Sequence, residues 1–384
     1  MGYQNKNLSV IIKGAYGDAN VGDDLLLEMV MSLLDKVKER NFDIKIVCRS
    51  APYLQKKYRE VKFISLAASK FESPDIYILG GGTQFFSFEN PEKVSPAKSR
   101  FSIYMKSIFK EPTLLAKYIL SIFSKNKKES LQLALGVGLG PFETSSIEEK
   151  VKKQMKSFFK IYPRDHASKE FLEKWGLSNW SLSADLCLTD IFKDKYPIDH
   201  VKRDEIKLGI VLRDWSHNDI GKVINDKVLD WTLSLGSIKH SLFIFSKLKD
   251  NSLIERVRRD YNKLKTTIWD PEIDDFYDFL KELNSCDILI TSRYHTAIFA
   301  LNLGIPTICL GIDPKLKILC DEVDGFYHWQ HHESMAVIDK FVESIKHDYS
   351  NHVLKVNNSY RVLNGRANSM VKDVIELLDQ HKNK

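Results

Sequence analysis

The stretch CDILITSRYHTAIFALNLGIPTICLG, residues 286–311, decides the fold class of this chain. Its first apolar run ends at Thr291, and an apolar helix is expected from about Thr296. Gly304 and Pro306 end that helix before a second apolar run begins. Continuous apolar strands separated by a helix are typical of a parallel sheet with helices on both faces. The segment therefore predicts a strand–helix–strand unit of an α/β domain.

The same alternation extends outward from this unit. In the second half of the chain, strands are expected at residues 206–214, 241–246, 266–270, 286–293 and 306–311. In the first half they are expected at residues 8–14, 44–48, 75–82 and 131–138. The charged stretch 192–205 is the expected linker. We therefore predict the α/β class, with two doubly wound Rossmann-like domains at residues 1–195 and 205–350 that face a cleft. A final helix within residues 351–384, starting near Arg361, is expected to pack back on the first domain.

Size and composition agree with this organisation. A chain of 384 residues exceeds one ordinary hydrophobic core. Lys and Arg exceed Asp and Glu by 57 − 51 = 6, and no aromatic-basic or zinc-finger pattern is present, so we expect no nucleic-acid partner. Five cysteines without C-x-x-C spacing predict free thiols in a reducing compartment. Because the sequence shows no signal peptide and no apolar run of about 18 residues, we expect a cytoplasmic protein.

One segment has a different pattern. Residues 101–128 combine large apolar side chains with six lysines. Such a basic amphipathic stretch can lie on an anionic bilayer, which would place the protein peripherally at the inner face of the membrane. A pair of helices that is broken at Pro112 and covers the sheet edge explains the same pattern, and the sequence leaves both open.

Binding residues are expected at the carboxyl ends of the strands, where open α/β sheets bind ligands. The turn after the first strand, GAYGDANVGDD at residues 14–24, is neither a G-x-G-x-x-G nor a P-loop sequence. Its candidate substrate-binding residues are Gly17, Asn20, Gly22 and Asp23. The carboxylates suit sugar hydroxyls, because they would repel a phosphate. Capping of the next helix by Asn20 and Asp23 is the alternative.

Two further strand ends are rich in glycine, LGGGTQFF at residues 79–86 and GVGLGP at residues 136–141. Gly82, Gln84 and Gly138 are the candidate substrate-binding residues there. Plain turns remain the alternative, because glycine is common wherever a chain turns tightly.

Two arginines at strand ends suit the recognition of an anion. Arg164 follows a short strand in YPRDHAS, and Arg213 ends the strand in VLRDWS. A guanidinium can hold a carboxylate or phosphate through two parallel hydrogen bonds. Pairing with the next residue, Asp165 or Asp214, is the alternative for each arginine.

The richest cluster lies at the carboxyl end of the first strand of the opening stretch. Ser292, Arg293 and His295 follow the strand, and the next strand leads to Asp313 and Lys315 at the same edge. A histidine between an arginine and a helix start is a good candidate for acid and base catalysis near neutral pH.

A second group of histidines, His328, His331 and His332, has the spacing of a metal-binding run. Trp329 and Gln330 interrupt the run and a loop is expected there, so we predict no metal site.

Together these motifs resemble those of polysaccharide pyruvyltransferases. The matching patterns are Y-G-x-x-N-x-G-D at 16–23, G-G-G at 80–82, G-x-G-x-G-P at 136–141, R-D-x-x-S at 164–168, R-x-H at 293–295 and D-P-K at 313–315. They run in family order across residues 8–325. The chain departs from the family at Tyr294, where leucine is more frequent, at Val137 and Leu139 in the glycine-rich loop, and at His166, where an acidic residue is frequent. These departures leave the acceptor open.

The resemblance implies a GT-B-like fold and a pyruvyl group donated by phosphoenolpyruvate, with no other cofactor. By motif, Arg164, His295 and Lys315 match positions on which the family relies for activity, and Arg293 matches a donor-binding arginine. The first domain is then the expected acceptor side and the second the donor side. The implied partners are phosphoenolpyruvate and a sugar, glycolipid or polysaccharide acceptor. A pyruvate ketal is the expected product, with an enolpyruvyl ether left open.

Two other functions remain open at this point. A GT-B glycosyltransferase that uses a nucleotide sugar shares the fold, and it would need a pocket for a base and a ribose in the second domain. A sugar- or lipid-binding protein that has lost catalysis would not need Arg293, His295 and Lys315 together. The cationic cluster favours a compact dianionic donor.

Overall fold

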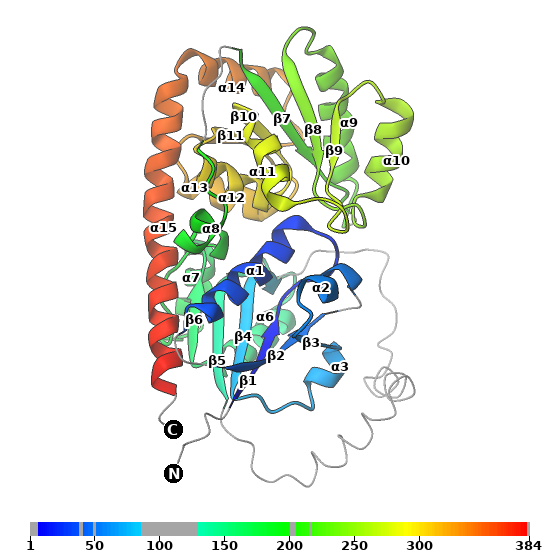
Figure 1. Ribbon diagram of the computed structural model, residues 1–384. Coiled ribbons are helices and arrows are strands. Elements are labelled where there is room, and N and C mark those ends of the chain that lie inside the picture. Colours follow the sequence, from blue (N-terminus) through cyan, green and yellow to red (C-terminus); the bar gives the residue numbers. More distant parts are fainter. Residues whose placement is uncertain are drawn as a thin grey trace, which may run out of the picture.

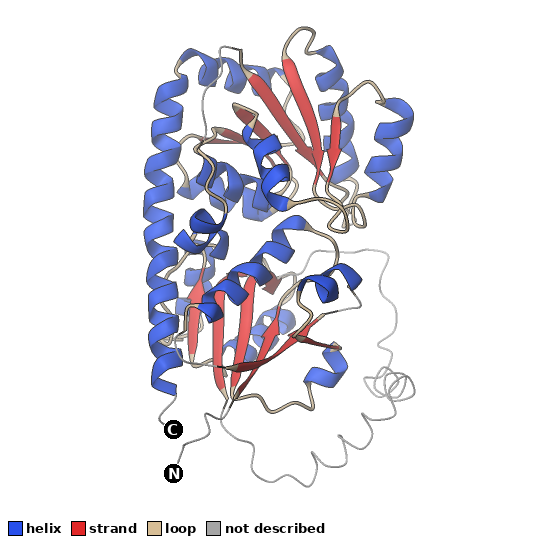
Figure 2. Cartoon of the chain, in the orientation of Figure 1, coloured by secondary structure: helices blue, strands red, loops and turns tan. Residues whose placement is uncertain are grey.

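The computed structural model describes residues 7–37, 41–48, 51–85, 130–199, 205–215 and 217–381. Figure 1 shows two α/β units, one above the other, and Figure 2 shows a sheet with flanking helices in each. The α/β class with two doubly wound, Rossmann-like units is confirmed. The segment 101–128, for which membrane contact is one prediction, lies outside the described residues.

The first unit contains a parallel sheet with the order β3-β2-β1-β4-β5-β6 in the described part of the chain. Its strands are β1 (Leu8–Lys13), β2 (Phe42–Val47), β3 (Lys62–Ile64), β4 (Ile76–Phe85), β5 (Leu131–Leu139) and β6 (Lys160–Pro163). The helical segments of this unit are α1 (Val21–Asp35), α2 (Pro52–Lys57), α3 (Leu66–Ser69), α6 (Ser145–Met155), α7 (His166–Lys174), the 3-10 turn η1 (Leu186–Leu188) and α8 (Asp190–Lys195).

The second unit repeats this design. Its parallel sheet has the order β12-β11-β10-β7-β8-β9 among the described residues, which is the order of the first sheet when the strands are counted from β7. The strands are β7 (Lys207–Leu212), β8 (Lys239–Ile244), β9 (Thr266–Ile268), β10 (Ile288–Thr291), β11 (Thr307–Leu310) and β12 (Phe326–Trp329). The helices are α9 (Ile220–Ser234), α10 (Asn251–Asp260), α11 (Phe276–Asn284), α12 (Tyr294–Leu303), α13 (Pro314–Glu322) and α14 (Ala336–His347).

Each sheet has a switch point, the place where the strand order reverses. It lies between β1 and β4 in the first sheet and between β7 and β10 in the second. In doubly wound sheets, ligands bind outside the carboxyl ends of the strands at this point. The topology therefore predicts a ligand site near the carboxyl ends of these four strands.

The last helix, α15 (Tyr349–Gln380), runs along both units, as Figure 1 shows. It begins before the expected start near Arg361. The hydroxyl of Tyr162 in β6 donates to Asp373 at 2.7 Å, and the hydroxyl of Tyr349 donates to the carbonyl of Asp287 at 3.2 Å. One helix thus contacts both sheets.

Apolar packing continues from one unit to the other. The interiors of the central strands β1, β7 and β10 are buried, and the same buried cluster includes residues of both sheets and of α15. At the boundary, the ring of Phe192 in α8 stacks on Phe299 in α12 with their centroids 5.9 Å apart. Burial of this apolar surface favours the observed arrangement of the two units.

The expected loop around His328 is wrong. His328 lies on β12, an edge strand that buries Phe326 and Trp329. In the described ranges, no group of three or more His, Cys, Asp and Glu side chains is placed to hold a metal ion. No helix in the same ranges is long and apolar enough to cross a membrane. The five cysteines all lie in these ranges, and no disulfide bond joins them.

Candidate active site

A cavity of about 170 Å³ lies between the units, lined by residues that follow β1 and β6 in the first sheet and β7, β8, β10 and β11 in the second. It is lined by Ala15, Asn20, Asp23, Arg164, Arg213, Phe245, Lys249, Arg293, Tyr294, His295, Asp313 and Lys315. Five of these side chains are cationic and two are carboxylates. The residues predicted from sequence that come together here are Asn20, Asp23, Arg164, Arg213, Arg293, His295 and Lys315.

Arg293 lies between β10 and α12 and is buried. Its backbone N–H donates to Thr291 Oγ1 at 2.9 Å, and its guanidinium pairs with the buried carboxylate of Asp250. The Arg293 Nε atom is also buried and has no hydrogen-bond partner among the described residues. Because an unpaired buried donor is costly, this nitrogen is a ready donor for a ligand.

His295 lies in the first turn of α12, and its ring sits against α1. A Cβ atom built on Gly22 would stand 2.1 Å from His295 Nδ1, so the ring fits only because Gly22 has no side chain. Burial lowers the pKa of His295, while the carboxylates of Asp185 and Asp23 oppose this shift. The amino end of a helix also disfavours a cation. His295 is therefore neutral at neutral pH and can accept a proton.

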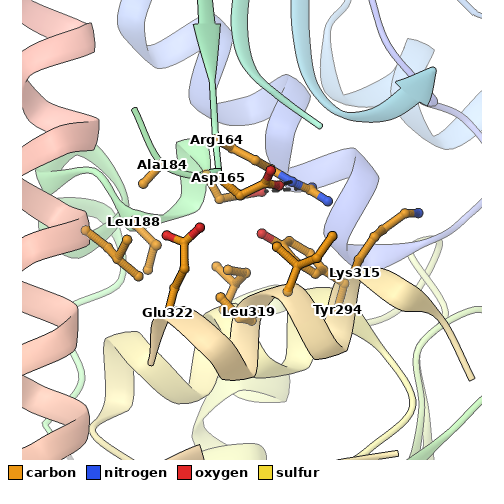
Figure 3. Close-up of a pocket in the computed structure, with 12 residues that line it drawn as sticks. Arg164, Asp165, Ala184, Leu188, Tyr294, Lys315, Leu319 and Glu322 are labelled. Carbon is orange, nitrogen blue, oxygen red and sulfur yellow. Dashed lines mark hydrogen bonds and ion pairs between the residues drawn. The ribbon is translucent and has the colours of Figure 1, made fainter. Parts of the chain in front are cut away.

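Arg164 lines the cavity from the end of β6. Figure 3 shows it with Tyr294 and Lys315 of the other unit around a neighbouring pocket. Its guanidinium lies 3.9 Å from the centre of the Tyr294 ring. Its nitrogens lie 3.4 Å from Asp165 and 3.6 Å from Asp185. The pairing with Asp165 thus exists, but Arg164 also contacts a second carboxylate and an aromatic ring of the other unit.

The pocket in Figure 3 is a second and much smaller space, of about 10 Å³. It shares Arg164, Tyr294 and Lys315 with the larger cavity, and Leu319 and Glu322 of α13 line it as well. Its volume admits about one water molecule. Side chains of the two units are therefore closely packed on this side of the cavity.

Lys315 lies in the first turn of α13, directly after Pro314. Asp313 caps this helix by accepting the Lys315 backbone N–H at 3.1 Å, and its carboxylate also lies 3.3 Å from Lys315 Nζ. Burial lowers the pKa of Lys315, Asp313 opposes the shift, and the nearby Arg164 and Arg213 add to it. The ammonium is thus surrounded by other cations.

Arg213 follows β7 and lies over the Trp215 ring at 4.9 Å. Burial, together with the charge of Arg293, lowers the pKa of Arg213 to about 10, so it remains protonated at neutral pH. The carboxylate of Asp214 accepts the Leu253 N–H at 3.0 Å instead of pairing with Arg213. Cations that lower each other's pKa in this way favour the binding of an anion between them.

The turn between β1 and α1 lines one side of the cavity with the amide of Asn20 and the carboxylate of Asp23. The side chain of Asn20 donates to the carboxylate of Asp23. Asn20 occupies the cap position of α1 but makes no side-chain cap hydrogen bond, so the capping alternative is wrong for Asn20. Asp24 orders the turn by accepting the Gly17 N–H at 3.0 Å and the Tyr53 hydroxyl at 2.7 Å. Burial raises the pKa of Asp24 to about 6.

This turn also contacts the second unit directly. Lys249 Nζ lies 3.0 Å from Asp18 and 3.9 Å from Asp23. The backbone N–H of Val21 donates to the carbonyl of Phe245 at 3.2 Å. The loop after β8 and the turn after β1 therefore close one end of the cavity together.

Several predicted residues do not line the cavity. Gly17 has a φ of 91° that favours glycine and acts through its backbone. Gly82 packs against α1, and Gly138 lies within β5. Gln84 lies on β4, but its side chain is outside the described residues. Ser292 is buried, and its hydroxyl donates to the carbonyl of Val211 at 3.3 Å.

Sequence reasoning missed Lys249, Asp250 and Asp185. Lys249 and Asp250 follow the expected strand 241–246, so their position at a strand end was an available signal. Asp185 is a single carboxylate in the otherwise apolar run ADLCL, which is a weak indication of a buried functional group.

The comparisons with known proteins concern the family and the fold of the chain. The family model described as polysaccharide pyruvyl transferase matches residues 20–314. All residues that line the cavity fall within this range except Ala15 and Lys315, which lie just outside it. No curated protein sequence matches the chain.

Solved structures share the fold at low sequence identity. MnaA of S. aureus in complex with UDP aligns with a TM-score of 0.58 and 12% identity, over 97% of each chain. A UDP-GlcNAc 2-epimerase from Neisseria meningitidis bound to UDP-GlcNAc aligns with a TM-score of 0.56 and 12% identity, over 98% of this chain and 100% of its own. HepE from Anabaena in complex with UDP-glucose aligns with a TM-score of 0.54 and 9% identity, over 96% and 100%. These similarities confirm the GT-B-like fold and carry no function.

Proposed function

Because the chain belongs to the polysaccharide pyruvyl transferase family, we propose that it transfers the pyruvyl group of phosphoenolpyruvate to hydroxyl groups of a sugar. The acceptor is a cell-surface polysaccharide or its lipid-linked precursor, the product is a pyruvate ketal, and phosphate is released. The observation that carries the proposal is the cavity of about 170 Å³ in which five cations meet one buried histidine.

The charges suit the donor. Phosphoenolpyruvate carries a carboxylate and a phosphate on three carbons, so it needs several cations within a small volume. Arg293 and Arg164 hold these anionic groups, and Lys315 binds the phosphate. Arg293 is supported by its buried and unpaired Nε. Lys315 is supported by its pKa, which burial lowers and the nearby Arg164 and Arg213 lower further. In a buried site such charges attract an anion more strongly than they would in water.

His295 is the acid and base of the proposed reaction. The bound donor brings negative charge next to the imidazole, which favours its protonated form. His295 then gives a proton to the terminal carbon, a sugar oxygen bonds to C2, and the hydroxyl proton returns to the histidine. Cleavage of the bond between C2 and the phosphate oxygen releases phosphate, and a second hydroxyl closes the ketal. Of the two hydroxyl protons, one ends in the new methyl group and the other leaves with the phosphate.

The acceptor is placed on the side of the first unit. Asn20 and Asp23 line this side, and the amide of Asn20 holds the Asp23 carboxylate. A carboxylate accepts hydrogen bonds from sugar hydroxyls, and a charged acceptor gives a stronger bond than a neutral one. We therefore assign donor binding mainly to the second unit and acceptor binding to the first.

A nucleotide-sugar glycosyltransferase fits the cavity less well. Pockets that bury larger ligands have volumes of about 300–1,000 Å³. The cavity here has about 170 Å³, and cationic side chains occupy much of its lining. Both properties favour a compact and highly charged donor.

The proposal includes no resident cofactor and keeps the cytoplasmic location expected from the sequence, with peripheral contact at the inner membrane face. Five cysteines without a disulfide bond among them support a reducing compartment.

Thermal unfolding of the purified protein with phosphoenolpyruvate, UDP or buffer tests the donor. A ligand that binds only the folded state stabilises it by about 2.7 kcal/mol at one hundred times its dissociation constant. We expect phosphoenolpyruvate to raise the unfolding midpoint and UDP to leave it unchanged. Lys315→Ala should remove the shift, whereas Lys317→Ala should keep it, because Lys317 is an exposed lysine of the same helix that pairs with Asp321. A shift with UDP alone would favour the glycosyltransferase instead.

A further inference from the structure

The carboxylate of Asp185 is buried beside the cavity, and its two oxygens make different contacts. Oδ1 accepts the backbone N–H of Cys187 at 3.0 Å and so caps η1. Oδ2 has no hydrogen-bond partner among the described residues, and it lies 3.6 Å from Arg164 Nη1 and 3.9 Å from His295 Nε2. Asp185 Oδ2 therefore faces Arg164 and His295, which are both assigned to the donor in the proposed function.

The backbone around Asp185 is shaped to bring it there. Gly136 in β5 has a φ of 55°, and a Cβ atom at this position would stand 3.0 Å from the carbonyl oxygen of Ala184. The same Cβ would stand 3.4 Å from the backbone nitrogen of Leu186. A side chain at residue 136 would therefore push the segment that carries Asp185 away from the sheet.

Like Asp185 Oδ2, His295 Nε2 is buried and has no hydrogen-bond partner in the described part of the chain. Polar atoms without partners are rare in protein interiors, and here two of them face each other. Their separation of 3.9 Å exceeds a hydrogen bond, so in this arrangement the carboxylate acts through its charge. Catalytic hydrogen bonds often tighten only when the substrate is bound.

The other groups that face His295 come from three further elements. Asp23 lies on α1, Arg164 follows β6, and Lys315 lies on α13. Asp185 and Asp23 favour the charged imidazole, whereas Arg164 and Lys315 disfavour it. Among the two carboxylates, the structure places only Asp185 within 4 Å of a ring nitrogen.

We propose that Asp185 is the positioning residue of His295: it keeps the proton on Nε2, orients the ring, and leaves Nδ1 to exchange a proton with the substrate. This inference rests on the proposed function for the identity of the reaction, but not for the state of the histidine. The same carboxylate also holds Arg164, so it couples the orientation of the acid and base to that of a donor-binding arginine. Asp185 itself touches neither substrate nor reacting atoms.

The substitution Asp185→Asn tests this role. An asparagine keeps the shape and can still cap η1, but its amide N–H can donate a hydrogen bond to Nε2 and so favour the opposite tautomer. We expect kcat to fall by about a thousandfold, because a misprotonated histidine in a comparable triad costs up to about ten thousandfold. The KM for phosphoenolpyruvate should change no more than in Asp165→Asn, since both carboxylates contact Arg164. Nitrogen-15 NMR of labelled histidine should show Nε2–H in the wild type and a shift toward Nδ1–H in the variant, together with a lower pKa for His295.

Asp165→Asn is the matched control, because Asp165 also contacts Arg164 but is not paired with His295. It should change donor binding and leave the histidine tautomer and pKa as in the wild type. An unchanged tautomer and titration of His295 in Asp185→Asn would overturn the proposal. If that variant does not fold, an Nδ1–H tautomer in the wild type would overturn it as well. Since NMR needs no substrate, a tautomer shift in a protein that does not turn over phosphoenolpyruvate would refute the proposed function alone.

Discussion

The two units have the same strand order, but the residues at their switch points differ in size and charge. In the first unit, Gly14 directly after β1 and Gly80 within β4 leave room for the Tyr16 ring. A Cβ atom on Gly14 would stand 2.1 Å from the Tyr16 ring, one on Gly80 would stand 2.2 Å from its hydroxyl, and that hydroxyl donates to the Gly80 carbonyl at 2.7 Å. In the second unit, the half-buried Arg213 follows β7 and the buried Arg293 follows β10.

The difference shows how much the topology determines. A doubly wound sheet determines where a ligand binds, since its switch point opens a crevice at the carboxyl ends of the strands. The loop residues determine what binds there. The glycine-rich side presents Asn20 and Asp23, which suit hydroxyls, and the cationic side suits an anion. The predictions below disturb one side at a time.

Removal of His295 should have the largest effect, because it removes the proposed acid and base from the cationic side. We expect His295→Ala to lower kcat by at least about a thousandfold, within the range for general acid–base catalysis. Phosphoenolpyruvate should still raise the unfolding midpoint, because the arginines and Lys315 remain. Steady-state kinetics and thermal unfolding measure the two properties. Near-normal turnover in a folded variant would remove His295 from the mechanism and leave the cationic side as a binding surface only.

The sequence predicts the cationic side well for a simple reason. Residues that directly follow a buried strand lie at the carboxyl edge of the sheet, and Arg213, Arg293 and His295 all have this position. Ser292 has it too, but successive side chains of an extended chain point in opposite directions. The Ser292 hydroxyl therefore turns inward to Val211, while Arg293 lines the cavity.

Other features depend on contacts that a sequence does not display. Arg293 meets Asp250 across 43 residues, and Asp185 meets His295 only because two separate units pack together. The strands β3 and β12, each at an edge of its sheet, are not among those expected from the sequence, because Lys62 and His328 interrupt their apolar runs. The close approach of Gly22 to His295 is likewise visible only in three dimensions.

The substitution Gly22→Ala is a second test with a smaller expected effect. Gly22 lies where the first unit contacts His295 of the second, and a side chain there would collide with the ring. Alanine has a higher helix propensity than glycine by about 1 kcal/mol, so any loss in Gly22→Ala must come from the contact with His295. We expect kcat to fall by about a hundredfold, because a displacement of about 1 Å of a catalytic group can cost that much. Gly365→Ala is the control: no atom lies within 4 Å of a Cβ there, and the variant should be stabilised by about 0.5–1 kcal/mol with unchanged kcat. A fully active Gly22→Ala enzyme would show that the ring can move without cost.

Asp23→Asn should have the smallest effect, and it distinguishes the two sides directly. The variant keeps an oxygen that can accept the Asn20 amide but loses the charge that strengthens hydrogen bonds from sugar hydroxyls. A loss of about 1.4 kcal/mol corresponds to a tenfold rise in the acceptor KM, with the donor KM unchanged. Asp18→Asn is the matched control, because Asp18 lies 3.0 Å from the same Lys249 but does not line the cavity. If Asp18→Asn raises the acceptor KM equally, the effect passes through Lys249. If Asp23→Asn changes only the donor KM, the acceptor does not bind on the glycine-rich side, and the two units share the donor instead of dividing the substrates.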